Sequence, residues 1–242
     1  MDSRGHIGCS HRTLFPILKI MYMRYLLIML GLLSIETSAQ QLIEFKPPVG
    51  YTKLLEAKGD LDKDGIDEMV FAYNTDRQNN ELAVFRVLYI CKLESGKLKL
   101  WKKNTSVLRS SKQCGFCVDK GIDLSLVIKN NTLAVSQTFN YNTRHYGTNK
   151  NIFRYQNGDW YLIGSTFNDY DTCDFDYKYD VNFSTKQVNV AYTYGDCDEG
   201  KVIPKDRTYN FKYPFASIPK MDGFMPGKAE HKIPNSKSFF YY

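Results

Sequence analysis

The sequence predicts an all-β fold, in which antiparallel hairpins form a meander sheet domain of sandwich or partial-propeller type after an N-terminal signal peptide. Apolar and polar residues alternate with a period of two through most of the chain, which is the pattern of a half-buried strand. Clusters of turn-forming residues separate these runs, as in domains built from hairpins. The chain also has 18 Tyr and 15 Phe among its 242 residues, and aromatic side chains favour strands. No amphipathic helix pattern follows the leader.

The N-terminal leader has the layout of a secretory signal peptide. A short basic n-region that ends in Met23-Arg24 precedes the apolar stretch YLLIMLGLLSI at residues 25–35, and small residues follow at Thr37 and Ala39. The stretch is shorter than the roughly 18–20 apolar residues of a membrane span. We therefore expect cleavage after Ala39, export to the periplasm or the extracellular space, and no transmembrane span in the mature chain. An uncleaved anchor is the alternative, and residues before Met21 are expected to be an overlong leader or to reflect a start codon assigned too early.

Composition divides the chain into three expected segments. Residues 1–39 form the leader and signal peptide, residues 40–213 form a single all-β domain, and residues 214–242 form a Pro-rich irregular tail. Five of the eight prolines lie at or after Pro204. Proline has no amide hydrogen to give to a central ladder, so we expect an irregular segment there that wraps the domain.

Eleven runs with strand character follow one another in the central segment. Each is short and apolar on alternate positions, and turn formers such as Asn130-Asn131 lie between them. The expected strands are residues 51–57, 68–74, 82–93, 98–103, 124–129, 132–139, 151–155, 160–167, 175–183, 188–194 and 207–213.

The clearest hairpin surrounds Asn157-Gly158. This pair tolerates positive φ at both centres of a type I′ turn, which would place Tyr155 opposite Trp160 and Phe153 opposite Leu162. Such aromatic pairs typically pack across strands in a half-buried sheet. We therefore expect Trp160 in the core, and a sugar-stacking platform is the alternative.

The acidic stretch GDLDKDGIDE, residues 59–68, predicts a structural calcium site. Its carboxylates alternate around one glycine, Gly65, and they would repel one another in the absence of a cation. Calcium takes about six to eight hard oxygen ligands, and a tight loop of alternating acidic side chains can supply them. The alternative is a solvated acidic turn without an ion. The expected ligands are the side chains of Asp60, Asp62, Asp64 and Glu68 and the backbone carbonyl of Ile66.

The loop is not an EF-hand, because its twelfth position is Phe71 where an EF-hand has Glu. The D-x-D-x-D-G-x-x-E spacing between two strands resembles the calcium loop of FG-GAP and integrin α-type repeats. That resemblance implies the ligand set given above, with Glu68 in place of the usual Asp. It covers only this loop and the strand entry after it, and the chain has no second copy, as a propeller would require.

More loosely, the chain after the leader resembles a group of uncharacterised exported bacterial proteins. The shared features are the acidic strand entry, an R-x-L strand that begins at Arg86, and the hairpin FRYQNGDWYLIG at residues 153–164. The resemblance implies a fold and no activity.

Five cysteines follow the leader, so at least one cannot pair within the chain. Cys91 lies inside an apolar strand, where a free thiol behaves as a small hydrophobe, and we expect it to be the unpaired one. Cys114 and Cys117 have redox spacing, but no helix is expected there to lower a thiol pKa. A structural disulfide or two plain thiols is the better interpretation.

Cys173 and Cys197 are a second candidate disulfide, because they bracket one hairpin. Alignment of its apolar faces places Phe183 opposite Val188. That register leaves the two cysteines one residue out of step, so a disulfide would require a bulge, expected at Gly195, or fraying of the hairpin ends.

The remaining patterns argue against catalysis and nucleic-acid binding. The net charge of +6 comes from scattered lysines, whereas a nucleic-acid partner favours a clustered basic face. Only His145 and His231 lie beyond the leader, and no G-x-S-x-G motif accompanies them. We expect an exported non-catalytic binding or envelope-associated protein with an unidentified envelope or extracellular ligand. The alternatives are a glycosidase-like hydrolase that uses carboxylates of residues 169–180, and a carbohydrate-binding module that uses Trp101 or Trp160.

Overall fold

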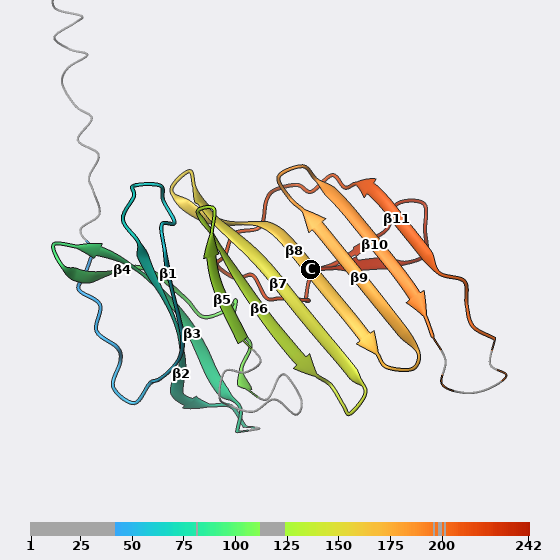
Figure 1. Ribbon diagram of the computed structural model, residues 1–242, viewed down its shortest axis with the longest axis horizontal. Helices are drawn as coiled ribbons and strands as arrows, with labels where there is room; N and C mark the ends of the chain where they lie inside the picture. The colour runs from blue at the N-terminus through green and yellow to red at the C-terminus, as the bar shows by residue number, and fades with distance from the viewer. Residues whose placement is uncertain (1–41, 81, 112–123, 196, 198–199, 201) are drawn as a thin grey trace, which may run out of the picture. The chain divides into compact units, whose positions relative to one another are not determined.

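Two antiparallel meander sheets make up most of the computed structural model (Figure 1). The structure describes residues 42–242 apart from residues 81, 112–123, 196, 198, 199 and 201. It confirms the all-β prediction, and the described residues contain no helix. The expected signal peptide and the candidate pair Cys114 and Cys117 lie outside the described residues. Within the described part of the chain, no helix has the length and apolar character needed to cross a membrane.

The first sheet has four strands in the order β1-β2-β3-β4: β1 (Thr52–Gly59), β2 (Glu68–Gln78), β3 (Val84–Glu94) and β4 (Lys97–Asn104). Its edge at β4 is extended by the segment before β1, where the Phe45 amide donates to Leu98 and the Leu100 amide donates to Ile43, both at 2.8 Å. The central strands β2 and β3 carry buried side chains on both faces of the sheet. Cys91 on β3 is buried and free, which confirms the expectation from its apolar surroundings.

The second sheet has seven strands in the order β11-β10-β9-β8-β7-β6-β5, so that every strand pairs with its neighbours in sequence. Their bounds are β5 (Leu124–Lys129), β6 (Thr132–Asn140), β7 (His145–Gln156), β8 (Asp159–Asp171), β9 (Phe175–Asn182), β10 (Gln187–Tyr194) and β11 (Arg207–Lys212).

The β7–β8 hairpin confirms the predicted turn and register. Asn157 and Gly158 have φ values of 50° and 77°, and Tyr155 pairs with Trp160. Trp160 is only 2% exposed, so it belongs to the core.

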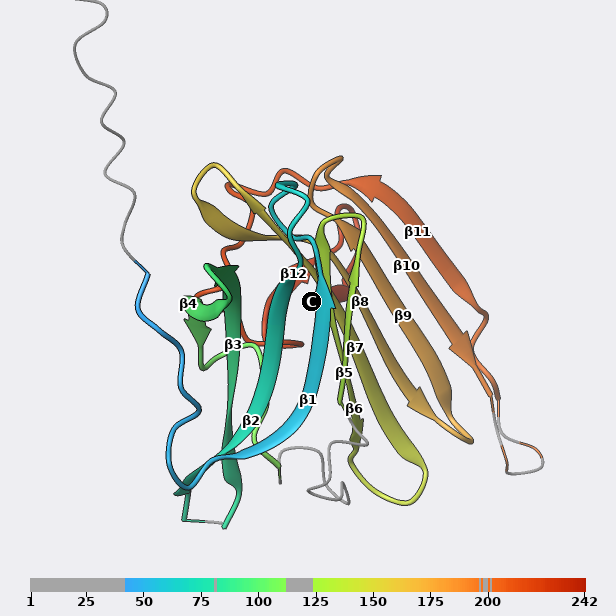
Figure 2. The same cartoon turned by 60° about the vertical axis from the view of Figure 1, so that its left-hand side comes forward.

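One apolar core lies between the two sheets, with side chains such as Ile90 from the first and Val135 from the second. Strand β1 lies beside β5 (Figure 2). The approach is close: a Cβ atom on Gly59 would lie 2.7 Å from Cγ2 of Ile128. The end of β1, where the acidic loop begins, is therefore held against the second sheet.

The β9–β10 hairpin corrects the predicted register. Val188 pairs with Val181 rather than with Phe183. Phe183 is 2% exposed but lies in the turn, where its ring contacts Phe215 at 4.9 Å between centroids. Alignment of the apolar residues predicts the wrong register because Phe183, although it lies in the turn, also belongs to the core.

The disulfide Cys173–Cys197 closes the far end of this hairpin, with 5.1 Å between the two Cα atoms. The β9–β10 ladder runs without a register shift to the pair Tyr194 and Phe175. The predicted bulge at Gly195 is therefore wrong, because Gly195 lies just past the ladder. Its amide donates to the Asp174 carbonyl at 3.1 Å, and a Cβ atom there would lie 3.0 Å from the Cys173 carbonyl oxygen. A side chain at this position would require the Cys173 carbonyl to shift, so glycine suits this close approach.

The C-terminal segment, residues 213–242, packs against both sheets. It contains a two-stranded sheet of β12 (Glu230–Lys232) and β13 (Phe239–Tyr241). The pairing of β8 with β9 begins only at Gly164. The free edge of β8 before that point is taken by the C-terminal segment: the Leu162 amide donates to Pro219 at 2.8 Å, and the Met221 amide donates to Trp160 at 2.9 Å. The expected domain boundaries at residues 39 and 213 stay a prediction.

Candidate metal site

The acidic loop between β1 and β2 is shaped by its own aspartates. Oδ1 of Asp60 accepts a hydrogen bond from the Lys63 amide at 2.6 Å, and Oδ1 of Asp64 accepts one from the Ile66 amide at 2.7 Å. Side chains that accept from amides two or three residues ahead replace the missing ladder bonds of a tight turn. Gly65 has a φ of 81°, which agrees with its expected place at the sharp turn.

Three of the predicted ligands come together. One carboxylate oxygen from each of Asp60, Asp62 and Glu68 lies within 4.8 Å of the other two, and the group is partly buried. Such a group can bind a metal ion, because three converging carboxylates supply hard oxygen ligands. The Asp64 side chain is exposed and lies outside this group, and Ile66 is 48% exposed. Asp64 and the Ile66 carbonyl stay predicted ligands.

Glu68 is the most deeply placed member of the group, with an exposed fraction of 1%. Its Oε2 accepts a hydrogen bond from the Leu61 amide at 2.7 Å. Burial raises the pKa of this carboxyl to about 7, although the Leu61 hydrogen bond acts in the opposite direction. A nearby cation favours the ionised form, so the site favours bound positive charge.

Lys92 supplies positive charge to the group, and no sequence pattern indicated this residue. It lies on β3, where the pairing of Met69 with Cys91 places it across from Glu68. Its ammonium forms an ion pair with Oδ2 of Asp62. Burial disfavours its charge, but the hydrogen bond and charge of Asp62 outweigh burial and raise the pKa of Lys92.

The loop is also tied to the second sheet. The side-chain amide of Asn131, in the turn between β5 and β6, donates to the Asp60 carbonyl at 3.0 Å. Leu61, between the first two aspartates, is 1% exposed and belongs to the core between the sheets. An ion held in this loop would therefore stabilise the junction of β1, β2 and the β5–β6 turn.

The second acidic run, residues 169–180, does not form a comparable group. Asp169 accepts from His145 at 2.6 Å, and Asp171 and Asp174 both bind Arg144. Asp180 accepts from the Thr166 hydroxyl at 2.9 Å. These carboxylates are thus engaged by His145, Arg144 and Thr166 rather than converging on one centre.

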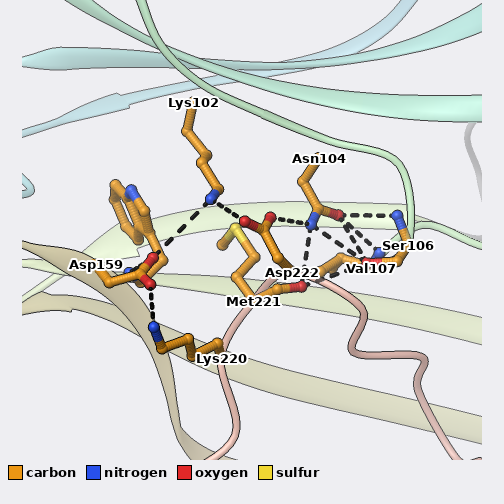
Figure 3. Close-up of polar contacts among 9 residues, drawn as sticks. Lys102, Asn104, Ser106, Val107, Asp159, Lys220, Met221 and Asp222 are labelled. Atoms are coloured by element: carbon orange, nitrogen blue, oxygen red, sulfur yellow. Dashed lines mark hydrogen bonds and ion pairs between the residues drawn. The ribbon is translucent and has the colours of Figure 1, made fainter.

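A third polar cluster joins the C-terminal segment to both sheets (Figure 3). Lys102 on β4 forms ion pairs with Asp222 at 2.5 Å and with Asp159 at 4.0 Å, and Asp159 also binds Lys220 at 2.9 Å. Beside them, the Asn104 side chain donates to the Met221 carbonyl at 3.0 Å. Every cation in this cluster is paired with a carboxylate, so its role is to hold three segments together.

The two tryptophans do not form the coplanar, exposed platform that a carbohydrate-binding module would need. Trp160 is buried, and the ring planes of Trp101 and Trp160 are inclined at 64° with centroids 5.1 Å apart. They pack edge to face as part of the core.

No family model, no curated protein and no solved structure matches the chain. The loop geometry is therefore the basis for a functional argument.

Proposed function

We propose that this chain is an exported, non-catalytic binding or envelope-associated protein in which residues 60–68 hold one structural calcium ion. The observation that carries the proposal is the convergence of Asp60, Asp62 and Glu68 within 4.8 Å. A structural role follows from the position of the loop, which joins the ends of β1 and β2 and contacts the β5–β6 turn.

The ligand chemistry favours calcium over transition metals. The converging side chains are all carboxylates, and hard oxygen ligands suit calcium and magnesium, whereas imidazole and thiolate ligands suit zinc and copper. Calcium tolerates irregular coordination geometry better than magnesium, which needs near-octahedral coordination.

Export is supported by the sequence of the leader and by the disulfide. The Cys173–Cys197 bond is consistent with an oxidising compartment. Extracellular calcium sites bind with dissociation constants of about 10⁻⁴ to 10⁻³ M, a range that suits a site filled permanently outside the cell.

Thermal unfolding in EDTA and in calcium tests the proposal. At ten times the dissociation constant, mass action gives about 1.4 kcal/mol, which raises the Tm by about 3–5 °C for a domain of this size. The wild type should show this rise. Asp60→Asn should lose most of it, because asparagine keeps the hydrogen bond to the Lys63 amide but removes a charged ligand.

Asp67→Asn is the matched control. Asp67 lies in the same loop but outside the carboxylate group, and it pairs with Lys58 at 3.5 Å on the surface. This variant should keep the full calcium response. A wild-type Tm that is identical in EDTA and in millimolar calcium would overturn the calcium site.

A further inference from the structure

We infer that Lys92 is an internal counter-ion of the calcium loop, which occupies the carboxylate group in the metal-free protein and sets the affinity for a divalent ion. This inference rests on the proposed function, because it assumes that the loop binds calcium. Lys92 lies outside the acidic motif and would nevertheless control the affinity of the loop for calcium.

The position of Lys92 is fixed by the sheet rather than by the loop. Lys92 and Glu68 lie on neighbouring strands, on the face of the first sheet that contributes Val70 and Ile90 to the core. The backbone of Lys92 is therefore held across from Glu68 by the strand pairing, and its ammonium reaches Asp62 in the loop to form the ion pair. Only 21% of the Lys92 side chain is exposed, so solvent screens this charge less than it would screen a surface lysine.

The indole ring of Trp101 is a second partner of the ammonium. The Nζ atom of Lys92 lies 4.4 Å from the centre of the Trp101 ring. The β3–β4 register shifts between Ile90 and Cys91, so that Trp101 is an extra residue in the ladder. A bulge of this kind redirects a side chain, and here the indole lies under the ammonium.

Asp62 and Trp101 together give the Lys92 ammonium a favourable contact both with and without bound calcium. The structure places the ammonium in contact with both Asp62 and the Trp101 ring, the arrangement that the inference assigns to the metal-free protein. When Asp62 binds calcium, the ammonium loses this carboxylate and keeps the cation–π contact, which is favourable in a partly desolvated site. Calcium therefore has to displace Lys92 from Asp62 and then remain close to its charge.

Removal of the Lys92 charge should tighten calcium binding. The ammonium and the calcium ion repel each other at short range in a site that water screens weakly, and we expect Lys92→Met to lower the calcium Kd at least about tenfold. Methionine keeps an unbranched side chain that packs on an aromatic ring. Calcium titration by calorimetry on the full folded chain measures the change.

Lys58→Met is the matched control, because it removes the same charge next to the loop. Lys58 pairs with Asp67, which lies outside the carboxylate group. We expect a Kd within about twofold of the wild type, since this exposed charge is screened by solvent.

The outcomes separate the inference from the proposed function. A Kd of Lys92→Met equal to that of the wild type, with both proteins binding, overturns the inference and leaves the calcium site intact. Binding by Lys92→Met alone supports Lys92 as counter-ion and overturns calcium binding by the natural chain. Absence of binding in every variant overturns both.

A measurement on the wild type keeps the inference testable if Lys92→Met does not fold. The NMR signals of the Lys92 side-chain CH₂ group next to Nζ can be assigned by their loss in Lys92→Arg. Calcium should shift these signals as the ammonium leaves Asp62. Calcium binding detected by calorimetry with an unchanged Lys92 signal would overturn the displacement.

Discussion

His231, on β12, is surrounded by aromatic rings of the C-terminal segment. The Tyr242 ring is stacked on the imidazole, with a centroid distance of 5.2 Å and an interplanar angle of 7°. Nδ1 faces the Tyr213 hydroxyl at 3.3 Å and Nε2 faces the Tyr242 hydroxyl at 3.1 Å. Burial among these rings disfavours the imidazolium and lowers the pKa of His231 below 6.5.

This lowered pKa predicts a loss of stability in acid. The unfolded chain binds a proton at His231 near pH 6.5 while the folded chain does not, so this contribution to stability is present above that pH and declines as the pH falls through the folded-state pKa. His231→Phe should keep the ring packing and lose this dependence. Urea unfolding of both proteins at about pH 7.5 and about pH 5 measures it.

The comparison between the two proteins isolates His231, because the other titrating groups are the same in both. The wild type should lose more unfolding free energy than His231→Phe between the two pH values. Equal losses would show that protonation of His231 does not oppose folding.

For single residues, the sequence predicts roles that depend on local spacing along the chain. Asp60, Asp62 and Glu68 converge because a tight loop fixes them relative to one another. Lys92 could not be predicted in the same way, since it lies 30 residues from Asp62 and reaches it only through the β2–β3 register. Trp101 needs in addition a bulge that no residue type in the sequence indicates.

The geometry at the end of strand β4 depends on one side-chain amide, that of Asn104. Asn104 is 4% exposed. Its Oδ1 accepts from the amides of Ser106 at 3.0 Å and Val107 at 2.8 Å, while its Nδ2 donates to the Met221 carbonyl. One side chain thus ends the strand and fastens the C-terminal segment to it (Figure 3).

Asn104→Ala should therefore destabilise the protein by about 2–4 kcal/mol, because it leaves several buried backbone groups without a partner. Asn189→Ala on β10 is the control, because Asn189 is exposed and its replacement should change stability by less than about 0.5 kcal/mol. Chemical denaturation compares the two variants. Similar effects would mean that water replaces the hydrogen bonds of Asn104.

The hairpins show which elements a sequence specifies. Asn157-Gly158 sets the β7–β8 register because its residues prefer the backbone angles that a two-residue turn requires. The four-residue turn between β9 and β10 carries no such preference, so the apolar character of Phe183 wrongly predicts a place in the strand. Strands β12 and β13 are too short for an alternating pattern to indicate them.

For the molecule as a whole, the sequence predicted the fold class but not how the sheets meet. Alternation predicts strands one at a time, whereas the division into four and seven strands depends on the break after β4. The C-terminal segment is a similar case. Its prolines indicate irregular structure, and they carry no information on the burial of Phe215, Met221 and Phe240 in the core.

The last prediction concerns the contribution of this segment to the stability of the molecule. Met221 has no exposed surface, lies in the core between the sheets, and pairs through its backbone with Trp160 and Asn104. Met221→Ala should lower the free energy of unfolding by about 2–5 kcal/mol, because it removes buried contacts and leaves a cavity. Equilibrium denaturation of the full chain measures the loss.

Met225→Ala provides the matched control, because the same substitution is made four residues further along and Met225 is 55% exposed. Its effect should stay within about 0.5 kcal/mol. A large difference between the two variants requires the segment to fold cooperatively with both sheets. If Met221→Ala were as mild as Met225→Ala, the segment would detach without unfolding the sheets, and the free edge of β8 before Gly164 would then be open to pair with another strand.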